Sequence, residues 1–302
     1  MQLFFPDVPP IPLPAGHRFP VGKYAMLRRQ IEADPAFAEV TLTPAEPATA
    51  HDLELAHAPD YVAAMTAGTV APDAMRRIGL PWSPTLVARS KATVGGAIQA
   101  ARTALRQGVS GQLAGGTHHA HRDFGSGFCV FNDLAVAGLA MLEEGRAARV
   151  AIVDLDVHQG DGNAAILAGD PRVFVLSIHG ARNFPFRKVP STLDVALPDG
   201  TEDAAYHAAL IDALAAVEAF RPDLILYLSG AEPLASDRLG RLRLTHEGLI
   251  ERDRLVMELA RRRGIPLSIA IGGGYAEPLE ESVRAYHNTF RTALAVLGPL
   301  SG

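Results

Sequence analysis

Five short apolar runs alternate with longer amphipathic segments along most of this 302-residue chain. The runs are rich in Val, Ile and Leu, and such near-continuous hydrophobicity is typical of a parallel strand buried on both faces. They occupy residues 111–116, 150–157, 173–179, 223–230 and 266–274. The predicted helices are 86–106, 132–145, 203–220, 246–263, with Thr245 as N-cap, and 281–297. This alternation predicts an α/β fold of three layers (αβα), with a central, mostly parallel sheet.

Composition limits the function classes. Hydrophobic residues make up 48% and charged residues 20%, which allows a sizeable core, and we expect one domain over residues 1–302. The net charge of −5 argues against nucleic acid as the main partner. The single cysteine, Cys129, excludes an internal disulfide and fits a reducing cytoplasm.

The N-terminal stretch "MQLFFPDVPPIPLPAGHRFP" lacks the basic start and apolar run of a signal peptide. Its prolines predict an extended or looped lead-in over residues 1–20. No stretch approaches the roughly 18 apolar residues of a membrane span. We therefore expect a soluble, cytoplasmic protein without a membrane partner.

Polar and ionisable residues follow each apolar run. In open α/β sheets, ligands bind beyond the carboxyl ends of the strands, so these residues are expected to form one site. They are His118 and His119, then Asp156 and His158, then His179, then Glu232, and finally Tyr275.

The segment "VDLDVHQGDG" carries the strongest metal-binding pattern. A spacing of two places Asp154, Asp156 and His158 on one face of a strand. The alternative without a metal ion is an aspartate that is hydrogen-bonded at the strand end, with His158 packed beside it. A hydrolytic zinc site needs three protein ligands and an open position for water. Asp156 and His158 supply two; Glu232 is the candidate third ligand, and Asp237 a second candidate further from its strand end.

Metal-activated water also needs a base and an oxyanion donor. The tandem His118-His119 in "GGTHHAHRDFGSGFC" can supply the base, with Asp154 and Asp161 as partners that fix each ring and raise its basicity. His121 is expected to be a solvated loop histidine or to lie behind this pair. Tyr275, after three glycines in "IGGGYAE" at a strand end, could donate a hydrogen bond to an oxyanion, although this motif taken alone favours a tyrosine half-buried on a turn.

Together these motifs resemble the histone deacetylase family, of the arginase/deacetylase superfamily. "GGTHHA…GSGFCVFND", "DLDVHQGDG", "LSGAEPLASDRLGRLRLT" and "GGGY" occur in the family's order, and the resemblance runs from about His17 to Tyr286. "IGLPWSPTLVARS" and "NFPFRK" look most like its small bacterial and class IV members. The resemblance implies an arginase–deacetylase fold and zinc-dependent removal of acyl groups from lysine ε-amines of proteins or peptides.

Residue roles follow from the resemblance by position. It implies zinc ligands at Asp156, His158 and Glu232, a proton-handling pair at His118 and His119, and a carbonyl donor at Tyr275. Asp154 and Asp161 would orient the histidines. Substrate-binding positions are implied at Gly127, Phe128, Phe184 and Gly273. A structural potassium ion is implied at Asp154, Asp156, His158, Ser177 and Ile178.

One position departs from the family pattern. In the family, the third ligand is the aspartate of a Gly-Ala-Asp sequence. This chain has Gly230-Ala231-Glu232 there, and the glutamate places its carboxylate one methylene further from the backbone. A misplacement of about 1 Å can cost roughly a hundredfold in rate. The glutamate leaves open a metal-containing acyl-lysine binder with impaired turnover.

Further alternatives for the substrate and the metal remain open at this level. The substrate could be an acetylpolyamine or another small amide, or a lysine carrying a long acyl chain. A ureohydrolase-like manganese pair would need more bridging aspartates than the motifs supply. Two carboxylates and one histidine could also hold iron or cobalt. The sequence leaves the oligomeric state open.

Overall fold

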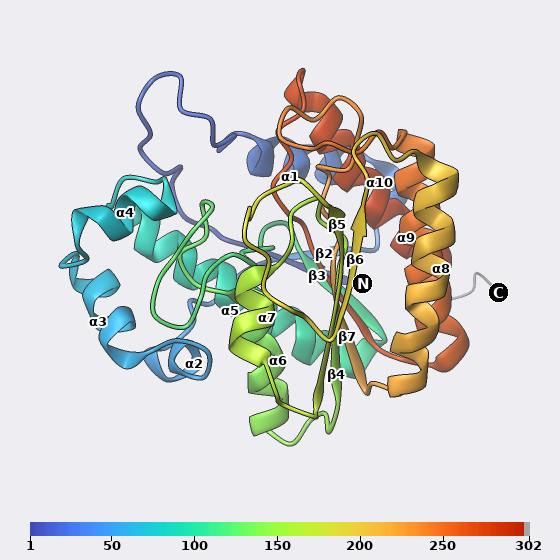
Figure 1. Ribbon diagram of the computed structural model, residues 1–302, viewed down its shortest axis with the longest axis horizontal. Coiled ribbons are helices and arrows are strands. Elements are labelled where there is room, and N and C mark those ends of the chain that lie inside the picture. The colour runs from blue at the N-terminus through green and yellow to red at the C-terminus, as the bar shows by residue number, and fades with distance from the viewer. Residues whose placement is uncertain (299–302) are drawn as a thin grey trace.

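The computed structural model describes residues 1–298, which form an eight-stranded sheet between two layers of helices (Figure 1). The strand order is β2-β1-β3-β8-β7-β4-β5-β6, and every pairing is parallel. The strands are β1 (Gln2–Phe5), β2 (Thr41–Pro44), β3 (Val109–Gln112), β4 (Val150–Asp154), β5 (Val173–Gly180), β6 (Leu193–Leu197), β7 (Leu224–Leu228) and β8 (Leu267–Ala270). The predicted three-layer fold is confirmed.

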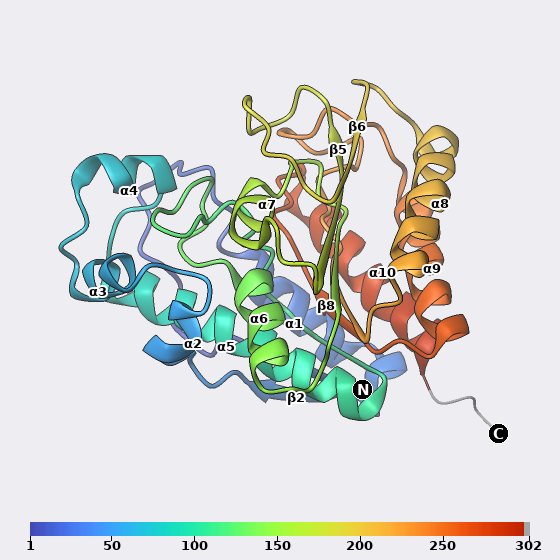
Figure 2. The same ribbon diagram turned by 60° about the horizontal axis from the view of Figure 1, so that its bottom comes forward.

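Helices from different parts of the chain cover the two faces of the sheet (Figure 2). One layer holds α1 (Lys23–Ala33), α8 (Asp203–Phe220), α9 (His246–Arg263) and α10 (Leu279–Leu297), and a 3-10 turn (Pro35–Phe37) follows α1. The other holds α5 (Pro84–Gln107), α6 (Asp133–Glu143) and α7 (Asp161–Leu167), with α2 (Ala50–Glu54), α3 (Pro59–Ala67) and α4 (Pro72–Ile78) beyond them.

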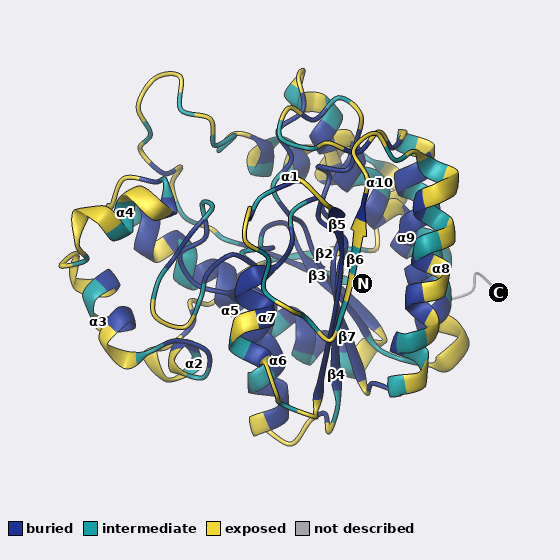
Figure 3. Cartoon of the chain, in the orientation of Figure 1, coloured by how far each residue is buried: buried dark blue, intermediate teal, exposed yellow. Residues whose placement is uncertain are grey.

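Successive residues of the central strands feed two separate cores. In β4, Ala151 and Val153 pack with the α8–α10 layer, whereas Val150 and Ile152 pack with the α5–α6 layer. All five residues of β4 and of β7 are buried, as the dark sheet in Figure 3 shows. Because side chains alternate between two buried faces, these strands appear as continuous apolar runs rather than alternating ones.

The predicted segments mostly coincide with real elements. The five predicted helices correspond to α5, α6, α8, α9 and α10, and the runs at 150–157, 173–179, 223–230 and 266–274 contain β4, β5, β7 and β8. The run at 111–116 was wrong beyond Gln112, where β3 ends. Gly115 and Gly116 there have φ of 99° and 69°, and the Asp133 carboxylate accepts the Gly116 amide at 3.0 Å. A left-handed backbone cannot continue a strand.

Several short elements escaped prediction. Residues 1–20 were predicted as a lead-in, yet β1 lies inside the sheet between β2 and β3. Its four residues are too few for a periodicity signal. The strands β2 and β6 lie at the two sheet edges with partly exposed residues, and α1 to α4 and α7 were also missed. The prediction of one domain over residues 1–302 stays a prediction, and residues 299–302 lie outside the described part.

Two buried helical glycines provide a matched test of this packing. A Cβ at Gly95 in α5 would overlap the Glu46 backbone carbonyl oxygen, whereas a Cβ at Gly138 in α6 would meet Leu226 and Val150 at 3.5 and 3.6 Å. We expect Gly95→Ala to lower the free energy of unfolding by at least about 2 kcal/mol, because backbone cannot yield as a side chain does. Gly138→Ala should be neutral or stabilising by up to about 1 kcal/mol. Urea denaturation of both variants checks this; equal effects would contradict the packing described.

Candidate active site

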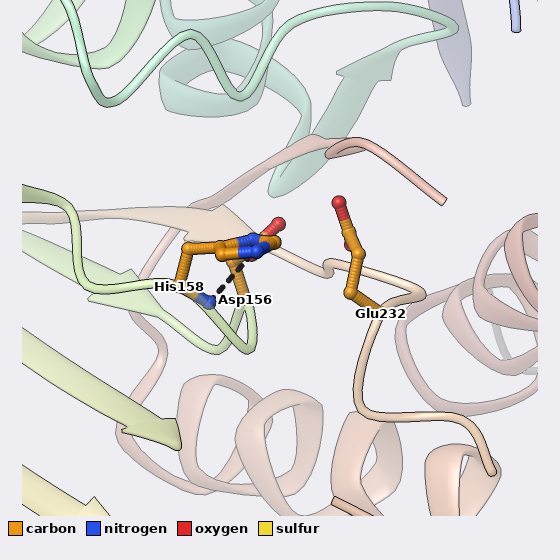
Figure 4. A group of neighbouring side chains, drawn as sticks. All are labelled: Asp156, His158 and Glu232. Atoms are coloured by element: carbon orange, nitrogen blue, oxygen red, sulfur yellow. Dashed lines mark hydrogen bonds and ion pairs between the residues drawn. The ribbon is translucent and has the colours of Figure 1, made fainter. Parts of the chain in front are cut away.

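Three potential metal ligands meet beyond the adjacent strands β4 and β7 (Figure 4). Asp156 and His158 lie in the loop after β4, and Glu232 lies in the loop after β7. One ligand atom from each residue lies within 4.8 Å of the other two. The two carboxylates are 1% exposed, and His158 is half-buried. Because β4 and β7 pair in parallel, their carboxyl-end loops necessarily come together.

The chemistry of this donor set fits a divalent cation. Burial raises the pKa of Glu232 well above its ordinary value, and the negative charges of Asp156 and Asp237 raise it further. Within residues 1–298, the buried Glu232 Oε2 has no hydrogen-bond partner. An unpaired buried carboxylate beside a second one is costly, and a metal ion would neutralise both.

The glycines of "IGGGY" make room for these carboxylates. A Cβ at Gly273 would overlap Glu232 Oε1, and one at Gly272 would come within 2.7 Å of Asp156 Oδ2. The loop after β8 therefore packs directly against both acidic ligands, which only glycine permits. Asp237, the alternative third ligand, is otherwise engaged: it accepts the Tyr275 amide at 2.6 Å and the amides of Leu239 and Gly240 at 2.8 and 2.9 Å.

The tandem histidines each face a different aspartate. His118 Nδ1 lies 2.7 Å from Asp154 Oδ2, and His119 Nδ1 lies 2.6 Å from Asp161 Oδ1. The two ring centroids are 4.2 Å apart, and both side chains are buried. His121, expected to be solvated or to lie behind the pair, places its Nε2 3.0 Å from the second oxygen of Asp161. Asp154 and Asp161, the two predicted partners, therefore each contact one histidine of the pair, and Asp161 also contacts His121.

Burial and neighbouring charge separate the pKa values of the pair. Burial alone would lower the pKa of His118, but the carboxylate of Asp154 prevails and raises that pKa to about 10. Burial, reinforced by the adjacent His118, lowers the pKa of His119 to about 4. At neutral pH, His118 is therefore charged and His119 neutral, a division suited to one electrostatic group and one base.

A cavity of about 550 Å³ opens above the three ligands. Its walls include Gly127, Phe128, Phe184, Gly273 and Tyr275. The Phe184 ring stands edge-on to His119, with centroids 4.8 Å apart, and Phe128 lies 6.1 Å from Tyr275. Every position assigned to substrate binding therefore borders the same cavity as the histidine pair.

The residues predicted to bind potassium lie in and next to strands β4 and β5. Ser177 in β5 pairs in register with Asp154 in β4, and Ser177 and Ile178 are fully buried. The Ser177 hydroxyl lies 3.0 Å from His179 Nδ1. Asp154 and Ser177 are neighbours in the sheet, whereas Asp156 and His158 lie in the loop after β4, and the potassium ion stays a prediction.

Three supporting residues were missed from the sequence. Asp133 accepts the amides of Gly116 and Thr117, which shapes the turn before the histidines. Arg252 of α9 donates to the carbonyl oxygens of Gly230 at 2.6 Å, Ser229 at 3.3 Å and Leu155 at 3.4 Å. His57 contacts the same histidine loop. Asp133 ends the quoted motif "GSGFCVFND", but its type alone did not assign it a role; Arg252 and His57 lie outside the quoted motifs, so no local pattern marks them.

Comparison with known proteins identifies the family. Residues 17–291 match the model of the histone deacetylase domain. The chain belongs to the histone deacetylase family. An uncharacterized protein of Picosynechococcus sp. is 44% identical over 284 residues, which cover 93% of this chain and 94% of that protein. Histone deacetylase 2 of Arabidopsis thaliana is 29% identical over 271 residues, covering 86% and 70%.

The fold agrees with this family. The crystal structure of the HDA15 HD domain superposes with a TM-score of 0.81 at 21% identity, covering all of this chain and 89% of that one. The fold is thus that of the arginase/deacetylase superfamily, and family membership supports a deacetylase, a hydrolase. The small bacterial, class IV-like assignment stays a prediction. No helix within residues 1–298 has the length and apolarity needed to cross a membrane.

His57 predicts how stability depends on pH. It is fully buried, its Nδ1 lies 2.8 Å from the His121 carbonyl oxygen, and its Nε2 accepts the Asn132 amide at 2.8 Å. Burial lowers the pKa of His57 to about 4. The unfolded chain, with an ordinary pKa near 6.5, therefore binds more protons between these values, and stability falls as pH falls from about 6.5 to 4, by up to about 3 kcal/mol.

Urea denaturation across this pH range checks the prediction. His57→Gln should have a smaller pH dependence, because glutamine does not titrate. His51→Gln, at a histidine whose side chain is 73% exposed in α2, is the control and should keep the original dependence. Identical slopes in both variants would remove His57 as the cause.

Proposed function

We propose that this chain is a zinc-dependent amidohydrolase that removes acetyl or longer acyl groups from lysine ε-amines of proteins or peptides. The observation that carries the proposal is the meeting of Asp156, His158 and Glu232 beneath a cavity bordered by the two histidine–aspartate pairs. Three ligands with room above them are typical of catalytic zinc. Family membership supports the hydrolase class.

Asp156, His158 and Glu232 would hold the zinc ion, which when bound makes water nucleophilic near neutral pH and polarises a carbonyl. His119 is the general base: its Nδ1 is engaged by Asp161, which leaves Nε2 to take a proton from the attacking water. Its low pKa keeps Nε2 unprotonated at neutral pH, and the charged His118 beside it opposes protonation. The same nitrogen then returns the proton to the departing lysine amine.

Tyr275 donates a hydrogen bond to the substrate carbonyl oxygen as negative charge develops there. Burial, and the negative charge of Glu232, raise the pKa of Tyr275 well above its ordinary value, so its hydroxyl stays protonated. Asp237 fixes this residue by accepting its backbone amide. The tyrosine is therefore a neutral donor at neutral pH.

The aromatic walls suit an alkyl chain. Phe128 and Phe184 would flank the lysine stem, and Gly127 keeps the passage open, since a Cβ there would come within 2.6 Å of His119 Cδ2. The cavity volume leaves both short and longer acyl groups possible. Acetylpolyamines are the second candidate substrates, because the same walls would accept a diamine. Partners are thus an acyl-lysine peptide or a small acylated amine, and we expect cytoplasmic action.

The manganese-pair alternative is less favoured by the contacts. Asp154 and Asp161 would have to bridge metals, but they contact His118 and His119 instead. The binder alternative rests on Glu232 and is tested directly below. Iron or cobalt in place of zinc, and potassium beneath it, remain part of the proposal to be tested by metal analysis.

Replacing His119 tests the mechanism. In zinc-loaded protein, His119→Ala should lower kcat by about 10²–10⁴-fold, because proton transfer loses its base. Zinc content should be unchanged, since His119 is not a ligand. His51→Ala, far out in α2, is the control and should keep full turnover. Retained turnover in the His119 variant, or loss of its zinc, would contradict the assigned role.

Shortening Glu232 tests the third ligand. The assay uses lysine peptides with acetyl, mid-length and long acyl groups, and acetylputrescine, with and without a chelator. Glu232→Asp should raise turnover of the best substrate if the longer side chain displaces the ion; a gain of about tenfold or more would show impairment. Equal, chelator-sensitive turnover would show that glutamate is accommodated. Activity in neither protein would favour the binder.

A further inference from the structure

The mouth of the cavity carries a charge opposite to that of the whole chain. Four arginines border it: Arg18 before α1, Arg77 at the end of α4, Arg182 after β5 and Arg241 in the loop after β7. All four are exposed. The net charge of the chain is −5, so this clustering does not reflect composition. We refer to these four residues as the arginine rim.

Neutralising groups at the rim are few. The described residues that border the cavity include only two carboxylates, Asp156 and Glu232, and both lie buried at its floor. Arg182 and Arg241 share one carboxylate, Asp199, at 3.8 and 3.2 Å. Arg77 lies over the Phe124 ring, and among residues 1–298 neither it nor Arg18 forms an ion pair. The rim thus has more positive than negative charge.

The rim is separate from the reacting groups. Its residues come from four loops or helix ends, whereas the metal ligands and histidine pair are buried below. A substrate whose acyl-lysine enters the cavity must place its neighbouring residues against this rim. Charges at the rim of a binding site mainly change the rate of association and the preference for one partner over another.

We propose that the arginine rim selects acyl-lysine in an acidic context, with Asp or Glu on the residues beside the modified lysine. This inference rests on the proposed function and names its substrate class. The rim repels peptides that carry Lys or Arg around the acyl-lysine.

The test compares three peptides with the same acyl-lysine and the same length. Their flanking residues are Asp and Glu, Ser and Ala, or Lys and Arg. With zinc-loaded protein at low ionic strength, kcat/KM should be about tenfold or more higher for the acidic than for the basic peptide, which corresponds to several exposed ion pairs acting together. The ratio should fall towards one at high salt, since surface charge is screened.

Matched variants locate the effect. The combined Arg18→Gln, Arg77→Gln, Arg182→Gln and Arg241→Gln protein should lose most of the acidic-to-basic ratio. A charge-matched control removes Arg29, Arg221, Arg261 and Arg262 in the same way; these arginines are exposed but do not border the cavity. The control should keep the original ratio. An equal loss of the acidic-to-basic ratio in both proteins would attribute the preference to net charge and contradict the proposed role of the arginine rim.

Failure of this inference can be told apart from failure of the proposed function. Hydrolysis of all three peptides at equal rates would contradict selection by the arginine rim but support the proposed hydrolase activity. If none is hydrolysed, fluorescence anisotropy with zinc-loaded protein still decides the rim: tighter binding of the acidic peptide that vanishes in the rim variant supports it. Equal binding of the acidic and basic peptides overturns it.

Discussion

Parallel pairing of β4 with β7 is the contact on which the rest of the site depends. It sets Asp156 and His158 beside Glu232, although more than 70 residues separate them in the chain. The buried guanidinium of Arg252 reinforces this arrangement by donating to the carbonyl oxygens of Leu155 and Gly230, one from each loop. Asp253 holds that guanidinium at 2.8 Å and itself accepts the Tyr227 hydroxyl at 2.5 Å. A fully satisfied polar network of this kind fixes one loop geometry.

The buried carboxylates around these two loops fall into two groups with different partners. Asp156 and Glu232 belong to the potential metal-binding group, where His158 Nδ1 also lies 2.9 Å from Asp156 Oδ1, and Asp154 and Asp161 are paired with the imidazoles of His118 and His119. The same low-dielectric surroundings that oppose an unpaired charge also separate the pKa values of His118 and His119, so a charged and a neutral ring sit side by side. The different protonation of these two histidines near neutral pH follows from their placement rather than from unusual residue types.

The mouth of the cavity differs in charge from its interior. The cavity is lined by apolar side chains and glycines, which under the proposed function would accept an alkyl chain. At the mouth lie four arginines, of which Arg182 and Arg241 share the carboxylate of Asp199, so the opening is positively charged in a chain whose net charge is negative. If the proposed acyl-lysine activity holds, selectivity for the residues beside that lysine could change by substitution at this surface without disturbing the buried groups.

The sequence alone determined the fold class, because strands buried on both faces must appear as continuous apolar runs. It also determined which residue types lie beyond each strand, hence the candidate ligands and histidine pair. Only the tertiary structure decided what depends on distant contacts: that β1 joins the sheet, that Asp237 binds backbone amides rather than joining the ligand group, and that Arg252 and His57 hold the site loops. Periodicity reports which face a residue occupies, whereas a hydrogen bond across 75 residues, such as that between His57 and Asn132, leaves no local pattern.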